Sequence, residues 1–172
     1  MKEIVLLYWP KGGSVEKTAN KLFESFDKND IDIFDLDSFD LGNLKNYKTI
    51  ILGNSTVGAE RWQDADNNNI WFSFFRELKD YDISNHKIAL FGLGNQVLYP
   101  AHFVDGLGFL YEEVINLNGN IIGKWPTEGY SFTDSEGVED DYFYGLALDE
   151  DFEPELTQER INKWIEQLKK ES

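Results

Sequence analysis

Cysteine is absent from the 172 residues, and the only histidines are His86 and His102. Without cysteine the chain has no disulfide, no thiolate-bound zinc and no iron–sulfur cluster held by its own side chains. Two histidines are too few for a His-rich metal site, and the carboxylates do not follow the spacing of a calcium-binding loop. No metal centre is therefore expected.

Long apolar runs and basic residues are also scarce. No apolar stretch approaches the roughly 20 residues of a membrane span, and the first apolar run, Ile4 to Leu7, follows neither a basic region nor a cleavage site. We therefore expect no signal peptide, no membrane partner and a cytoplasmic protein. The chain has 16 Lys and Arg against 32 Asp and Glu, a net charge of −16. This charge disfavours binding to nucleic acid and favours a basic protein partner, although solubility alone would also explain it.

Short apolar runs alternate with amphipathic segments along the chain. The runs at residues 4–8, 31–36, 49–52 and 87–91 predict strands, and a fifth strand begins at 120–123 and resumes at 143–148. Helical spacing of apolar residues predicts helices at 15–26, 71–78, 103–117 and 157–168, the last with Thr157 at its capped start. This alternation is typical of an α/β fold, a doubly wound five-stranded parallel sheet with helices on both faces. We expect a single domain, residues 1–172, whose fifth strand is interrupted by an insertion at roughly 124–142.

In such sheets ligands bind at the carboxyl ends of the strands, which points to the loops at residues 9–14, 54–69 and 92–102. In the first loop, Gly12, Gly13 and Ser14 lie between a strand and a helix, where backbone N–H groups can bind an anion. The loop matches neither a Walker motif nor a dinucleotide fingerprint. An ordinary turn is the alternative interpretation.

Small residues in the other two loops let backbone amides meet the edge of a flat ligand. They occur at residues 53–58 and 92–96, and Tyr99 is placed to stack on the ligand's face. Ordinary turns with a surface tyrosine would have the same composition.

Several longer stretches resemble the long-chain flavodoxin family. Residues 87–96 (KIALFGLGNQ) resemble its fourth strand and flavin loop, and Tyr99-Pro100 with Phe103 resembles its stacking tyrosine and the turn that follows. Residues 123–132 (GKWPTEGYSF) are similar to the insertion that splits its fifth strand, and residues 145–151 (GLALDED) with 154–157 (PELT) and Arg160 to its C-terminal signature. The family consists of five-stranded doubly wound domains that hold FMN non-covalently.

The resemblance implies a set of FMN-binding residues. Tyr99 would stack on the outer flavin face, Val57 would occupy the inner face, and Thr56 would contact the phosphate or ribityl chain. Gly58 would hydrogen-bond the reduced flavin N5 through its peptide, Asn95 would face the pyrimidine edge, and Asp149 would reach the ribityl hydroxyls. The full expected set is Pro10, Lys11, Gly12, Gly13, Ser14, Val15, Thr56, Val57, Gly58, Gly94, Asn95, Tyr99, His102 and Asp149.

The first loop departs from the family pattern. Pro10, Gly12 and Val15 stand where hydroxyl-bearing residues are usual, and Lys11 adds a cation. Asn95 replaces the usual Asp, His102 replaces a common Asn, and residues 59–62 (AERW) are unlike most members.

The resemblance implies a low-potential electron carrier and not an enzyme. It would pass one electron at a time on FMN between basic redox partners, a flavodoxin reductase or similar donor and an acceptor enzyme, and act as a monomer. The altered loop leaves an alternative open: a flavodoxin-like protein with weakened or lost FMN binding, which binds another flat cofactor or serves as a dedicated docking partner.

Two other function classes fit the sequence poorly. A receiver-type signalling domain needs acidic residues where this chain has Trp9-Pro10 and Gly53-Asn54. A hydrolase needs a nucleophile with a base, and neither Ser14 nor Ser55 has a histidine nearby in the sequence.

Overall fold

The computed structural model describes residues 1–55 and 69–172. Its main elements alternate in the order β1 (Ile4–Tyr8), α1 (Ser14–Ser25), β2 (Ile31–Asp35), β3 (Thr49–Asn54), α2 (Ile70–Leu78), β4 (Lys87–Leu93), α3 (Asp105–Asn116), β5 (Asn120–Ile122), β9 (Leu146–Leu148) and α4 (Thr157–Glu171). Short 3-10 helices lie at Leu36–Ser38, Leu41–Asn46 and Pro154–Leu156. None of the helices in the described part of the chain has the length and apolar composition of a membrane span.

The central sheet has the strand order β2-β1-β3-β4-β5, and all its neighbouring strands pair in parallel. Its fifth position is filled by two segments in succession. β5 pairs with the first half of β4, where Ala89 faces Ile122, and β9 pairs with the second half, where Phe91 faces Leu146. The predicted doubly wound, five-stranded parallel sheet is confirmed, and this pairing agrees with the expected interruption of the fifth strand.

The chain between β5 and β9 forms a small antiparallel sheet of its own. Its strands β6 (Trp125–Pro126), β7 (Val138–Glu139) and β8 (Tyr142–Phe143) are ordered β6-β8-β7. Phe143 therefore belongs to this small sheet, and the prediction that the fifth strand resumes there was wrong. That strand resumes at Leu146.

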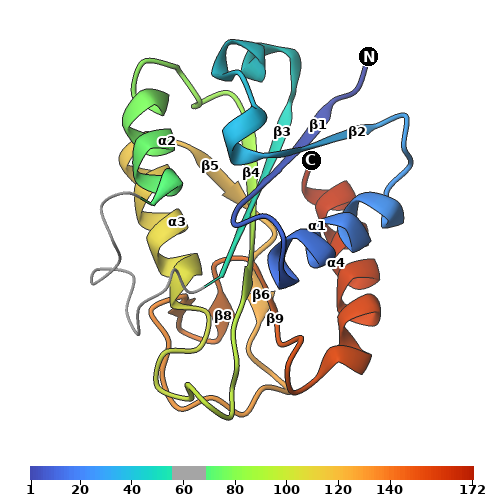
Figure 1. The fold of residues 1–172 in the computed structure, drawn as a ribbon, viewed down its shortest axis with the longest axis vertical. Coiled ribbons are helices and arrows are strands. Elements are labelled where there is room, and N and C mark those ends of the chain that lie inside the picture. Colours follow the sequence, from blue (N-terminus) through green and yellow to red (C-terminus); the bar gives the residue numbers. More distant parts are fainter. Residues whose placement is uncertain (56–68) are drawn as a thin grey trace.

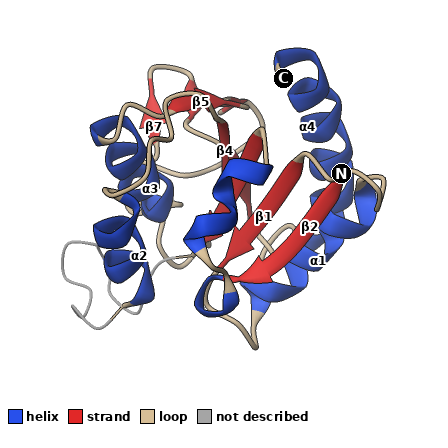
Figure 2. Ribbon diagram, turned by 90° about the horizontal axis from the view of Figure 1, so that it is seen from above, coloured by secondary structure: helices blue, strands red, loops and turns tan. Residues whose placement is uncertain are grey.

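Helices cover both faces of the central sheet. Figures 1 and 2 show α1 and α4 on one face and α2 and α3 on the other. Successive side chains of a strand point to opposite faces, so Leu6 packs into the core that includes Trp164, and Leu7 packs into the core that includes Phe75. Burial on both faces explains why the strands read as continuous apolar runs instead of alternating ones.

The parallel direction of the strands brings distant loops to one edge of the sheet. The carboxyl ends of β1, β3, β4 and β9 lie at the same edge of the sheet, toward the lower half of Figure 1, so the segments that follow these strands meet there. The C-terminal Ser172 lies at the opposite edge, beside Glu3 and Thr49. A ligand site at the carboxyl edge would therefore draw residues from widely separated parts of the sequence.

Candidate functional site

A cleft opens at the carboxyl edge of the sheet. It has a volume of about 300 Å³ and is lined by Pro10, Ser14, Val15, Ser55, Leu93, Gly94, Asn95, Tyr99, Glu150 and Asp151. The structure thus brings together the first and third predicted loops, including six of the expected site residues. The position is the one at which doubly wound sheets bind ligands.

The first loop ends at the start of α1. Gly13 is the N-cap residue and has no side chain that could cap the helix, so the first amides of α1, which have no intrahelical acceptor, also receive no N-cap side-chain acceptor. Gly12 has a positive φ of 85°, a conformation that favours glycine. A Cβ added at Gly12 or Gly13 would meet no atom within 4 Å. The helix start is therefore open on the side where an anion would bind.

Charged side chains surround this loop on both sides. The carboxylate of Glu16 accepts hydrogen bonds from the Gly12 N–H, at 2.6 Å, and from the Tyr8 hydroxyl, at 2.9 Å. Burial and the bond to Glu16 raise the pKa of Tyr8 to about 12, so the hydroxyl remains a donor at neutral pH. The Lys11 ammonium lies 3.7 Å from Asp35 Oδ1 at the end of β2, and its side chain is 59% exposed. Lys11 is thus an exposed cation near an open helix start.

The β4–α3 loop, residues 94–104, forms the opposite wall. Asn95 Oδ1 accepts from the N–H groups of Val97 (3.0 Å) and Leu98 (2.9 Å), and the Asn95 carbonyl accepts from the Tyr99 N–H (3.0 Å). These bonds close a turn that leaves the Tyr99 side chain 53% exposed at the cleft. Gly94 is required by close packing, because a Cβ there would lie 2.7 Å from the Phe103 ring. The turn therefore leaves an exposed aromatic side chain at the cleft.

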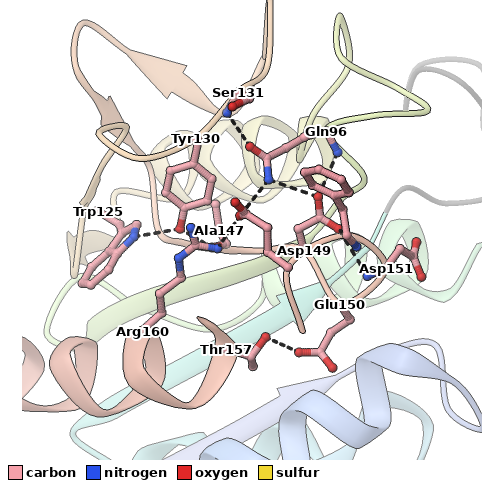
Figure 3. Close-up of polar contacts among 12 residues, drawn as sticks. Gln96, Trp125, Tyr130, Ser131, Ala147, Asp149, Glu150, Asp151, Thr157 and Arg160 are labelled. Atoms are coloured by element: carbon pink, nitrogen blue, oxygen red, sulfur yellow. Dashed lines mark hydrogen bonds and ion pairs between the residues drawn. The ribbon is translucent and has the colours of Figure 1, made fainter. Parts of the chain in front are cut away.

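Asp149 is not among the residues that line the cleft. It is fully buried, and its carboxylate accepts from the Gln96 N–H (3.0 Å), the Gln96 side-chain amide (3.1 Å), and the N–H groups of Asp151 (3.2 Å) and Phe152 (2.9 Å). Figure 3 shows this carboxylate directed at the Gln96 side chain. The expected contact of Asp149 with ribityl hydroxyls stays a prediction. In the structure the carboxylate holds its own turn to the β4–α3 loop.

His102 does not line the cleft, although its N–H donates to the carbonyl of Tyr99, which does, at 3.1 Å. Its Nδ1 is 3.0 Å from Oδ2 of Asp105, the first residue of α3. Asp105 is fully buried, and burial raises the pKa of its carboxyl group even though the Glu136 N–H donates to it at 2.8 Å. His102 thus anchors the end of the β4–α3 loop to the helix that follows.

The remaining expected residues divide into two groups. Lys11, Gly12 and Gly13 adjoin the cleft through their neighbours Pro10 and Ser14 without lining it. Thr56, Val57 and Gly58 lie outside the described residues. Sequence reasoning missed Ser55, Leu93, Glu150, Asp151 and Gln96, although Glu150 and Asp151 directly follow Asp149 in the C-terminal signature. Position in that signature was the signal that could have found these two carboxylates.

Comparison with known proteins decides the family. Residues 6–164 match the model of the family described as flavodoxin. The chain belongs to the flavodoxin family. Its curated relatives include a flavodoxin of Picosynechococcus sp., which is 37% identical over 170 residues and covers 98% of this chain and 97% of the relative. Flavodoxin 1 of Escherichia coli is 36% identical over 160 residues, with 92% and 88% covered.

Solved flavodoxin structures agree with this fold. The crystal structure of Fusobacterium nucleatum flavodoxin bound to flavin mononucleotide has a TM-score of 0.86 and 29% identity to this flavodoxin, and the match covers 99% of each chain. The similarity therefore extends over both layers of helices and over the loops that form the cleft.

Proposed function

We infer that this flavodoxin is an electron carrier that holds FMN non-covalently in the cleft at the carboxyl edge of its sheet. The observation that carries the inference is the pairing of an exposed aromatic face, Tyr99, with an open helix N-terminus, that of α1, across one cleft. The Fusobacterium nucleatum structure that matches the whole chain is described as bound to flavin mononucleotide. The alternative of a flavodoxin-like protein without FMN gains no support from these features.

The residues of the cleft fit the parts of FMN. Tyr99 supplies a stacking surface for the ring system. The first amides of α1 and the Lys11 ammonium supply positive partial or full charge for the phosphate. The space beside Gly12 and Gly13 leaves that end accessible. FMN supplies the redox chemistry itself, and the chain binds it, orients it and adjusts its electrostatic surroundings.

As a flavodoxin, the protein transfers electrons to partner proteins and is not itself an enzyme. We propose that these partners, a reductase or similar donor and an acceptor enzyme, present basic surfaces, and that the carrier is a monomer. The net charge of −16 supports a basic partner, as do the carboxylates of Glu150 and Asp151 at the cleft. Complementary charge mainly raises the rate of encounter.

Titration of the apoprotein with FMN tests the proposal. A stoichiometric complex with quenched flavin fluorescence is expected, and flavin released from the purified holoprotein should be identified as FMN. The holoprotein reduced by light should then pass electrons to a basic acceptor such as cytochrome c. Absence of FMN binding in the titration would refute the electron-carrier assignment.

A further inference from the structure

The insertion between β5 and β9 follows the β4–α3 loop along much of its length. The N–H groups of Thr133 and Asp134 donate to the Pro100 carbonyl at 2.7 and 3.0 Å, and the Ser135 hydroxyl donates to the Phe103 carbonyl. Earlier in both segments, the Ser131 N–H donates to the side-chain oxygen of Gln96 at 2.5 Å. The loop that carries Tyr99 is therefore supported from behind by a segment distant in sequence.

Gln96 is the side chain on which these segments converge. It is 2% exposed. Its amide nitrogen donates to Asp149 Oδ2 at 3.1 Å and to Glu153 Oε2 at 2.9 Å, while its oxygen accepts from Ser131. Figure 3 shows Gln96 lying between Ser131 on one side and Asp149 on the other. One side chain thus connects the β4–α3 loop, the insertion and the turn after β9.

The far side of this network is fixed by largely buried groups. Arg160 Nη1 donates to Glu153 Oε2 at 3.0 Å, and the guanidinium lies 4.1 Å from the ring centre of Tyr130. The Tyr130 hydroxyl donates to the Ala147 carbonyl at 2.6 Å. Burial strongly raises the pKa of Tyr130, so this donor persists at neutral pH. Gln96 is therefore held by partners that are themselves held in place.

The chemistry of the position selects a neutral amide. A primary amide has two N–H donors and an acceptor oxygen, and Gln96 uses the nitrogen for two carboxylates and the oxygen for a backbone N–H. A Glu side chain would lose both donors at neutral pH and would add a negative charge beside Asp149 and Glu153. An apolar side chain would remove one partner from the Ser131 N–H and from both carboxylates, which is most costly at the buried Asp149.

We propose that Gln96 is a positioning residue that fixes the β4–α3 loop, and with it Tyr99, in the geometry that receives the ring end of the cofactor. The proposal rests on the proposed function, since it assumes that the cleft binds a flavin. Because a preformed loop loses less conformational freedom on binding, the network raises flavin affinity without contacting the flavin. Gln96 should therefore affect how tightly the ring system of the flavin binds. The start of α1 and Lys11 should affect how tightly its phosphate binds.

Substitution of Gln96 tests whether this residue affects binding of the flavin ring and not binding of the phosphate. Gln96→Met keeps the side-chain length and the net charge but removes the hydrogen bonds. We expect affinities of the apoprotein for FMN and for riboflavin to fall by the same factor, on the order of ten-fold, with their ratio unchanged. Gln158→Met is the matched control, because Gln158 is exposed on α4, and it should leave both affinities unchanged.

A second variant and an exchange measurement test the hydrogen-bond network independently of Gln96→Met. Gln96→Glu retains the acceptor for Ser131 and the side-chain size, and riboflavin, which lacks the phosphate charge, should still bind on the order of ten-fold more weakly. In the wild-type apoprotein, the N–H groups of Gln96 and Ser131 should be protected from hydrogen exchange before any flavin is added.

Each of three results would overturn the proposal: riboflavin affinity within two-fold of wild type in the folded variants, a loss confined to FMN, or unprotected amides at Gln96 and Ser131. If the wild-type apoprotein bound neither flavin, the proposed function itself would fail, which is a distinct outcome. Unchanged wild-type binding with unaffected variants would refute only the role of Gln96.

Discussion

Removal of the Lys11 ammonium should weaken FMN binding and leave riboflavin binding unchanged. Lys11 is the only basic residue among residues 9–15, next to the open start of α1. Pro10, Gly12 and Val15 supply no hydroxyl groups there, so we expect the phosphate to depend on backbone amides, on the Ser14 hydroxyl and on this cation. Lys11→Ala deletes the cation without changing the glycines that shape the loop.

The structure sets the size of the effect. A hydrogen bond to a charged group contributes about 1.5–3 kcal/mol. Lys11 delivers less than that upper value, because its side chain is 59% exposed and its ammonium lies 3.7 Å from Asp35. We therefore expect a loss of about 1–1.5 kcal/mol, which corresponds to a roughly 5- to 13-fold rise in the Kd for FMN.

Parallel titrations of the apoprotein with FMN and riboflavin measure this effect. Lys17→Ala is the matched control, because it removes the same charge from an exposed position on α1. Asp35→Asn should strengthen FMN binding, since it releases Lys11 and removes a negative charge. Equal losses for FMN and riboflavin in Lys11→Ala, or an equal loss in Lys17→Ala, would refute the assignment of Lys11 to the phosphate end.

Three further predictions concern potential, salt and pH. Asn95→Asp places a carboxylate where the Asn95 amide now donates to Asp151 at 3.3 Å. The potential of the second one-electron reduction of bound FMN should therefore become more negative by on the order of 50 mV. A positive shift in a spectroelectrochemical titration would contradict this. Electron transfer to cytochrome c should slow from low to moderate ionic strength, because salt screens exposed charge, and stopped-flow rates that stay constant would count against charge steering. Burial, followed by the hydrogen bond to Asp32, raises the pKa of Tyr47 to about 12 from 10.0. The unfolded chain therefore loses this proton first, and stability contributed below pH 10 is lost as the pH rises toward 12; urea unfolding of Tyr47→Phe should show a smaller loss over that interval.

The sheet could be predicted because each long strand is recognisable from its own run of apolar residues. The run Ile4–Tyr8 is buried on both faces, so it is apolar without interruption, and the spacing of such runs with amphipathic segments sets the topology. The small sheet β6-β8-β7 has strands of two residues each, too short for any periodicity. The prediction that Thr157 caps α4 was also wrong: Leu156 is the N-cap residue, and the Thr157 hydroxyl donates to Glu150.

Some features of the site could likewise be predicted from the neighbouring sequence, whereas others depend on residues distant in the sequence. Pro10, Ser14 and Tyr99 could be placed at the cleft because each lies in or at the end of a segment that leaves the carboxyl end of a strand. The direction of the Asp149 side chain could not be predicted, because it depends on Gln96, 53 residues earlier in the chain. Side-chain direction in a buried network follows from partners that only the folded chain brings together.

The two ends of the cleft are built with different rigidity. At the ring end, both polar atoms of the buried Gln96 side chain have hydrogen-bond partners, Asp149, Glu153 and Ser131, which should fix the β4–α3 loop before a ligand arrives. At the phosphate end, Lys11 is exposed, the space beside Gly12 and Gly13 is open, and the Glu16 carboxylate holds the loop through the Gly12 N–H. A rigid end contributes affinity mainly by avoiding an entropic cost, whereas a loose end contributes mainly through charge. Binding of riboflavin should therefore be governed by the ring end, and the additional affinity for FMN should be modest and sensitive to salt.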